Sequence, residues 1–400
     1  MQYNLLFYGF YTDFCTPNNN NVSEKDEHLR TLLGHFKPDI FAVNEMGRGA
    51  ENVSRLLDSV LNSSGIDYFE HGTYTNSTNS WFANALYFDS RKFGLYHEAV
   101  PSSTLRDINL YTLYYKAEDL HLTGDTIFLT FIVAHLKAGQ STTDQQTRTS
   151  MVNNVMHYLN THNYSGNIFF MGDFNMKSSY EQAYQLMVGH SIPEIRFHDP
   201  IGVNGIWGNN PDMAPYHTQS PRTGSHSCFV TGGLDDRYDF ILASNAIMNG
   251  LNGFQYIEDS YTTIGQDGNR FNQSLISPPN FSQPEEIISA VYNISDHLPV
   301  MLDLVSVETT FAHTQGFTDF EVVFPNPVKD ILDMQIKSGF SGELSINMYC
   351  ISGRKLLEKI CWHAFSSNCR LDFSYLKAGV YLLNIDLPDG RSYAYRIMKM

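Results

Sequence analysis

Residues 168–175 read Ile-Phe-Phe-Met-Gly-Asp-Phe-Asn, an apolar run that opens into a turn with two oxygen-bearing side chains. The apolar residues predict a buried strand, and Asp173 and Asn175 then project on the same side of the turn. Carboxylate and carboxamide groups suit a hard divalent cation or a phosphate oxygen. An ordinary structural turn is the alternative interpretation of so short a string.

Four further apolar segments deliver polar groups in the same way. The polar residues are Glu45 after residues 40–44, His135 at the end of 131–135, Asp239 within 235–242, and Asp296 with His297 ahead of 300–304. A carboxylate between hydrophobic residues is costly to bury alone, so Asp239 needs a partner, and a histidine is the obvious one.

Each of these residues also has a structural interpretation. Glu45 would be a solvated strand end, His135 a core histidine, and Asp239 an ion-pair partner of Arg237. Their joint occurrence favours an enzyme site at one rim of a sheet sandwich, with acidic groups for a cation and histidines for proton transfer.

The order of these segments resembles the endonuclease/exonuclease/phosphatase superfamily, the deoxyribonuclease I-like phosphodiesterases, over residues 3–304. The segments that carry the resemblance are 37–45, 172–175, 237–240 and 295–300. The family's first asparagine matches Asn4, although a register through Tyr8 would place Gly9 there instead. Helical spacing in 23–36 and 147–159 adds helices to the strands. We therefore expect an α+β fold, a four-layer α/β/β/α sandwich.

The resemblance implies a role for each site residue. Glu45, with Asn4 and Asp296, would hold one Mg²⁺ or Mn²⁺. His297, oriented by Asp239, would be a general base or a protonated donor to the phosphate.

The remaining roles concern the water and the phosphate. His135 would lie opposite His297, with Asp173 and Asn175 orienting the water and a phosphoryl oxygen. Arg106, Lys137 and Arg148 are candidate phosphate contacts, with solvated surface cations as the alternative.

The implied activity is hydrolysis of phosphate esters by a secreted, divalent-metal-dependent phosphodiesterase, with a nuclease as the first choice. A phosphatase or sphingomyelinase-like phospholipid diesterase is the alternative, and a non-catalytic surface-binding protein is the second. No local motif selects the substrate. The segment 204–233 is either a set of substrate-facing loops or a surface excursion.

Net charge argues against a dedicated nucleic-acid binder. Residues 1–318 carry 16 basic and 33 acidic side chains, a net charge of −17, whereas the whole chain carries −16. Tight nonspecific binding needs many cations that neutralise phosphates. An enzyme that brings a divalent cation to its substrate remains compatible with this charge.

The chain changes character after Leu304. We expect a catalytic domain at 1–305, a linker at 306–318 rich in Thr, His and Gly, and a small all-β sandwich at 319–400. The last segment resembles the C-terminal sorting domain of the type IX secretion system of Bacteroidetes. The matching strings are 325–327, 351–354, 376–381 and 396–399. An accessory carbohydrate-binding sandwich is the alternative.

The sorting domain implies secretion, or display on the outer membrane, in a Bacteroidetes-type bacterium, with the secretion machinery as a partner. The start of the chain has no recognisable signal peptide, and no run is long enough to cross a membrane. We expect a monomer. Five cysteines without a CxxC pair make a structural zinc site unexpected. In an exported protein Cys15 and Cys228 could form a disulfide or remain buried thiols.

Overall fold

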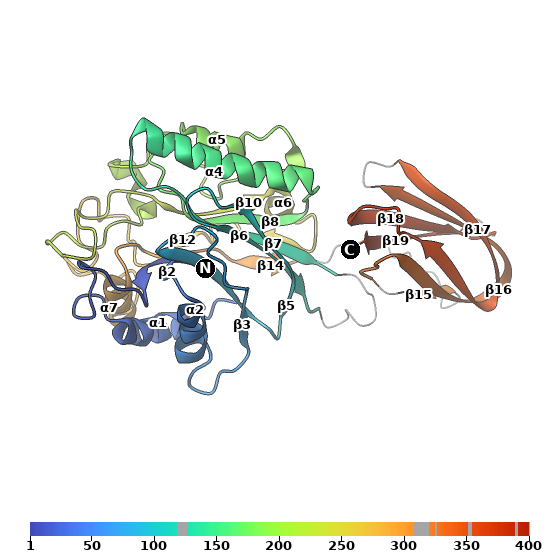
Figure 1. Ribbon diagram of the computed structural model, residues 1–400, viewed down its shortest axis with the longest axis horizontal. Helices are drawn as coiled ribbons and strands as arrows, with labels where there is room; N and C mark the ends of the chain where they lie inside the picture. The colour runs from blue at the N-terminus through green and yellow to red at the C-terminus, as the bar shows by residue number, and fades with distance from the viewer. Residues whose placement is uncertain (118–125, 308–319, 325, 351–353, 389–390, 400) are drawn as a thin grey trace. The chain divides into compact units, whose positions relative to one another are not determined.

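The computed structural model describes residues 1–117, 126–307, 320–324, 326–350, 354–388 and 391–399 (Figure 1). The chain divides into two compact units. The first comprises Met1–Lys116 and Ile127–Thr309, and the second comprises Ala117–Thr126 and Thr310–Met400. The predicted linker at 306–318 lies outside the described residues from 308 onward.

The first unit contains two six-stranded sheets. One sheet has the order β12 (Thr262–Thr263), β13 (Val300–Met301), β1 (Gln2–Tyr8), β2 (Ile40–Gly47), β4 (Phe82–Asp89) and β3 (Phe69–His71). The other has the order β5 (Phe93–Ser102), β6 (Ile108–Tyr115), β7 (Phe128–His135), β8 (Asn167–Asp173), β10 (Asp239–Ser244) and β9 (Phe197–His198). The pairs β1–β2 and β7–β8 are parallel.

Helices cover the outer face of each sheet (Figure 1). The first sheet packs against α1 (Val22–Phe36), α2 (Ala50–Leu56) with its continuation Leu57–Leu61, and α7 (Glu285–Ile294). The second packs against α4 (Thr142–Thr161) and α5 (Gln182–Val188). A third apolar cluster, including Leu86, Phe131 and Phe169, contains residues of both sheets. Two sheets between two helical layers confirm the predicted four-layer fold.

Local sequence explains where the two longest of these helices begin. The side chain of Asn21 accepts hydrogen bonds from the backbone of Ser23 and Glu24 at the start of α1. Ser141 and Asp144 form a reciprocal capping box at the start of α4. Such caps satisfy backbone N–H groups that have no partner within the helix. The two helices span the predicted segments 23–36 and 147–159.

Smaller elements complete the first unit. They are the ribbon of β11 (Phe254–Tyr256) and β14 (Leu304–Ser306), the short helix α6 (Asn245–Asn249), and 3₁₀ turns at Pro193–Ile195 and Pro211–Tyr216. The backbone N–H of Val307 also donates to the carbonyl of Gly253. Pairing with the first unit therefore extends two residues beyond the boundary predicted at residue 305.

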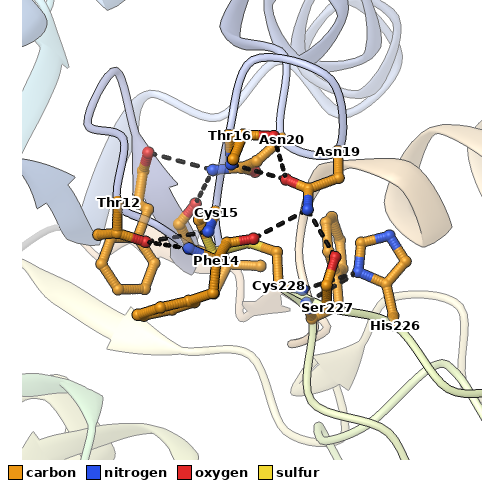
Figure 2. The surroundings of a disulfide bond; sticks show 12 residues. Thr12, Phe14, Cys15, Thr16, Asn19, Asn20, His226, Ser227 and Cys228 are labelled. Atoms are coloured by element: carbon orange, nitrogen blue, oxygen red, sulfur yellow. Dashed lines mark hydrogen bonds between the residues drawn. A yellow bond between two sulfur atoms is a disulfide. The ribbon is translucent and has the colours of Figure 1, made fainter.

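The disulfide Cys15–Cys228 joins the loop after β1 to the segment 204–233 (Figure 2). Asn19 strengthens the junction, since its Nδ2 atom donates to the carbonyl of Phe14 at 2.8 Å and to Oγ of Ser227 at 2.6 Å. Of the two states left open for these cysteines, the structure has the disulfide. A crosslink over 213 residues restricts the unfolded chain far more than a short loop would.

The second unit is all-β. Its strands are β15 (Phe320–Val323), β16 (Ile331–Cys350), β17 (Lys355–Asp372), β18 (Gly379–Asp386) and β19 (Ser392–Lys399). They form one antiparallel sheet in the order β15-β16-β18-β19, with β17 also paired to β16. Its core includes Leu344, Ile346 and Leu383. No helix of the described residues is long and apolar enough to span a membrane.

Candidate active site

Three neighbouring strands of the second sheet bring a histidine and two carboxylates into one row. His135 pairs with Asp173 across β7 and β8, and Asp173 pairs with Asp239 across β8 and β10. All three residues are buried, with at most 3% of their surface exposed. The row exists because each apolar strand has its polar residue at the same edge of the sheet.

Asn4 links this row to the first sheet. Its Nδ2 atom donates to Oε1 of Glu45 at 3.2 Å and to Oδ2 of Asp173 at 3.0 Å. Glu45 lies in an irregular part of β2 and has a φ of 52°. A left-handed conformation is unfavourable for a glutamate, and such strain is often kept where a side chain must be aimed at a site.

His297 forms a buried pair with Asp239. The Nδ1 atom of His297 lies 2.7 Å from Oδ2 of Asp239, and its Nε2 atom lies 3.8 Å from Oδ2 of Asp173. Burial opposes the charged imidazole, but Asp239 and Asp173 outweigh it and raise the pKa of His297 well above its ordinary value. Arg237, the alternative partner of Asp239, instead forms a two-bond ion pair with Asp199.

His135 is held in one tautomer. Arg106 donates from Nη1 to Nδ1 of His135 at 2.6 Å, so the proton of the neutral ring is on Nε2. Burial lowers the pKa of His135 well below its ordinary value, and the positive charges of Arg106 and His297 lower it further. Its Nε2 lies 3.5 Å from Oδ2 of Asp173 and 3.8 Å from Oε1 of Glu45. The ring therefore presents an N–H donor to the acidic cluster.

The environment of the site disfavours the negative charge of its carboxylates. Burial raises the pKa of Asp173, and Asp239 and Glu45 add to the increase while His297 opposes it. Burial also raises the pKa of Glu45, with Asp296 adding to the effect. Among the described residues, Oε2 of Glu45 and Oδ1 of Asp239 are buried without a hydrogen-bond partner. A cation or an N–H group of a ligand would satisfy such atoms.

The donor set fits a hard cation. One ligand atom each from Glu45, His135 and Asp173 lie within 4.8 Å of one another. Because Nε2 of His135 carries a proton in this arrangement, the available ligands are the oxygen atoms of Glu45 and Asp173. Oxygen ligands of this kind are those that Mg²⁺ and Mn²⁺ prefer. The predicted ligand Asn4 instead turns its Nδ2 toward these two carboxylates, and its Oδ1 accepts a hydrogen bond from the backbone of Leu6 at 2.9 Å.

Asp296 and Asn175 lie beside these groups. Asp296 is buried, and its Oδ2 atom accepts a hydrogen bond from the backbone of Val230 at 3.0 Å. The backbone N–H of Asn175 donates to Oδ1 of Asp173 at 3.0 Å, and its φ is 53°. Asn175 thereby fixes the rotation of the Asp173 carboxylate.

Of the three candidate phosphate contacts, Arg106 alone contacts the histidine and acid cluster in the described residues. Lys137 forms an ion pair with Asp144 at the start of α4. Arg148 is fully buried and donates to Glu181 twice and to two backbone carbonyls. The hydrogen-bond donors of Lys137 and Arg148 are occupied by these partners. We therefore do not include these two residues among the proposed phosphate contacts.

Several residues that hold the site were not expected from the sequence. Oδ1 of Asn44 accepts a hydrogen bond from the backbone N–H of Asp173 at 2.9 Å. Nε2 of Gln219 lies 2.8 Å from Nε2 of His297. Oγ1 of Thr218 accepts from the backbone of Tyr238 and Asp239. Asn44 could have been noticed as a polar residue inside an apolar strand, whereas Thr218 and Gln219 lie in a loop whose position only the fold decides.

Residues 322–399 match the family described as Secretion system C-terminal sorting domain. This match confirms the predicted type IX sorting domain, and with it secretion or cell-surface display in a Bacteroidetes-type bacterium. The secretion machinery is therefore a partner of this chain. No curated protein matches the chain.

Solved structures are similar to this chain at low identity, and an endonuclease/exonuclease/phosphatase family protein from Bacteroides thetaiotaomicron is among them (13% identity, 76% of this chain and 94% of that chain, TM-score 0.46). The human Nocturnin catalytic domain with bound sulfate is another (15%, 76% and 92%, 0.46). A third is D. rerio TDP2 complexed with a single strand DNA product (14%, 76% and 97%, 0.46).

Proposed function

We propose that this protein is a secreted, divalent-metal-dependent phosphoric ester hydrolase that cleaves phosphodiesters, with nucleic acid as its substrate class. The observation that carries the proposal is the convergence of Glu45, Asp173 and the Asp239–His297 pair at one buried edge of two sheets. Burying like charges close together destabilises the folded protein. A bound cation or ligand would offset this cost, so their convergence indicates a binding site.

Each side chain has a task in this proposal. Glu45, with Asp296, would hold Mg²⁺ or Mn²⁺, which would supply charge neutralisation at the scissile phosphate. Asn4 orients the carboxylates of Glu45 and Asp173 through its Nδ2. Asp173, whose pKa is raised, takes the proton of the attacking water. His297, charged below its raised pKa, donates a hydrogen bond to a phosphate oxygen.

The other groups orient the phosphate. His135 presents its Nε2–H from the opposite side, and Arg106 fixes its tautomer while adding positive charge. Asn175 holds the Asp173 carboxylate in place. Nε2 of His135 and Nε2 of His297 lie 3.5 Å and 3.8 Å from Oδ2 of Asp173, so two N–H donors are available to the phosphate oxygens beside the acidic cluster.

We also propose that the chain is divided into two parts with separate functions. Residues 1–305 form the catalytic domain, and 319–400 the sorting domain. We propose that the protein acts as a monomer, because the site draws all its residues from one chain.

A substrate panel tests the function. Purified protein is assayed with single-stranded DNA, duplex DNA, RNA, sphingomyelin and bis-p-nitrophenyl phosphate, with Mg²⁺, with Mn²⁺ and with excess EDTA. We expect hydrolysis of nucleic acid that depends on the metal. Full activity in EDTA would remove the metal from the proposal, and hydrolysis of sphingomyelin alone would replace the substrate class. No hydrolysis of any phosphate ester would leave a non-catalytic surface-binding protein.

A further inference from the structure

A continuous series of aromatic rings leads from the candidate site to the protein surface. The ring centroid of Phe82 is 5.8 Å from that of His135, and the ring of Phe7 is 4.6 Å from Phe82. Phe7 in turn contacts Phe14 at 5.6 Å and Phe10 at 6.4 Å. The rings therefore connect the reacting end of the site to the loop that follows β1.

The outer rings are open to solvent. Trp81 lies 6.0 Å from Phe10 and is 51% exposed, and Phe14 is 45% exposed. We call Phe10, Phe14 and Trp81 the aromatic surface. The two exposed rings are connected through Phe7 and Phe10 to a polar site, and such a series is unusual for a surface without a ligand.

The aromatic surface has a rigid base. Phe7 packs in a buried cluster with Cys15, Cys228 and Phe229, and the disulfide anchors the loop that carries Phe14 to the segment of Cys228 (Figure 2). The backbone N–H of Arg48 donates to the carbonyl of Trp81 at 3.0 Å. A fixed base lowers the entropy that binding would otherwise cost.

Two arginines accompany the rings. The guanidinium carbon of Arg48 is 5.2 Å from the ring centre of Phe10, and that of Arg106 is 5.6 Å from the ring centre of Phe82. Positive charge is scarce in residues 1–318, whose net charge is −17. Its placement beside the rings suits a ligand that alternates flat apolar groups with anionic groups.

We propose that the aromatic surface is a subsite on which unpaired nucleobases of the substrate stack, so that the enzyme acts on single-stranded nucleic acid. The inference rests on the proposed function and names the form of its substrate. Stacking needs a free base face, which a single strand offers and a continuous duplex does not. Arg48 then contacts the phosphate groups of the strand whose bases stack on the rings.

A lipid surface is the competing occupant, and the composition of the patch argues against it. A membrane-binding face needs a contiguous apolar area with positive charges toward anionic lipid. Here the exposed members are aromatic rings beside one arginine, and the domain is strongly acidic. Stacking with a few bases fits this set better than insertion between acyl chains.

The test compares two substrates that differ only in their bases. One is an oligothymidylate, and the other has the same phosphodiester backbone with tetrahydrofuran abasic units. In Trp81→Ala, kcat/KM for oligothymidylate should fall about tenfold, the size expected for loss of one base–ring contact. The value for the abasic strand should stay within about twofold. Phe281→Ala is the matched control, because Phe281 is 90% exposed and lies before α7; it should change neither value.

Equal losses on both substrates, or no loss on either, would overturn the proposal. A loss confined to sphingomyelin vesicles would assign the surface to lipid instead. Binding separates this question from catalysis: fluorescein-labelled oligothymidylate is titrated by anisotropy into the full chain with EDTA present. Trp81→Ala should weaken binding of the oligothymidylate about tenfold. If this loss occurs although the wild type hydrolyses no substrate, the proposed function is refuted and the aromatic surface is supported. Unchanged binding would refute the surface whatever the activity.

Discussion

Asp239→Asn should lower the pKa of His297 and the turnover of the enzyme together. The two side chains are 2.7 Å apart, and at most 4% of either is exposed. At a charge separation of about 4 Å and an effective dielectric of about 20, the attraction is of the order of 4 kcal/mol. Asparagine keeps the shape and removes the charge of Asp239, the largest attraction that favours the charged imidazole, so the pKa of His297 should fall.

The pH dependence of stability follows from the direction of the shift. The pKa of His297 is raised in the folded protein, so the pair stabilises it fully below the ordinary value of about 6.5. This contribution is lost as the pH rises through the folded-state pKa. The melting temperature of the wild type should therefore exceed that of Asp239→Asn by more at pH 6 than at high pH, measured in EDTA.

Three assays check the prediction. The pKa of His297 is followed by NMR of nitrogen-labelled histidine, with His297→Ala identifying the signal. Turnover on a phosphodiester should fall at least about a hundredfold. Asp199→Asn is the control, since it breaks an equally buried pair with Arg237, an arginine that does not titrate in this range. That variant should lose stability with the pKa of His297 unchanged. An unaltered His297 pKa and wild-type turnover in Asp239→Asn would refute the pairing argument.

Three further expectations concern other parts of the chain. Glu45→Gln should reduce turnover at least about a hundredfold with the melting temperature retained, because it removes a metal ligand and relieves buried negative charge; activity within a few-fold of wild type would exclude Glu45 from the site. Arg148→Met should destabilise the first unit by about 3–5 kcal/mol in urea unfolding, since it leaves Glu181 buried and unpaired, while the folded variant keeps its turnover; a large loss of turnover at unchanged stability would return Arg148 to the phosphate contacts. A chain ending at Val307 should remain folded and active in vitro but stay in the cell envelope of the native host; normal export, or a folded but inactive product, would contradict the assignment of residues 319–400 as a sorting domain.

The sequence alone predicted the four layers of the fold and the polar residues at the ends of the strands. Short apolar runs such as 168–171 and 131–134 favour buried strands, and the helical spacing in 23–36 and 147–159 favours helices that cover an apolar surface. These predictions were correct because the spacing of apolar residues along a strand or helix depends only on residues that are close together in the sequence. The same rules placed Asp173, Asp239 and His135 at the ends of strands.

Only the tertiary structure decided which polar groups meet. The register of β7, β8 and β10 sets His135, Asp173 and Asp239 in one row, and no feature of a single segment encodes that register. Arg148 is a second example. The sequence made it a candidate phosphate contact, but in the structure its guanidinium pairs with Glu181, 33 residues away. Contacts across long sequence separations depend on how sheets and loops pack, which is why the sequence identified the participants and the fold determined their partners.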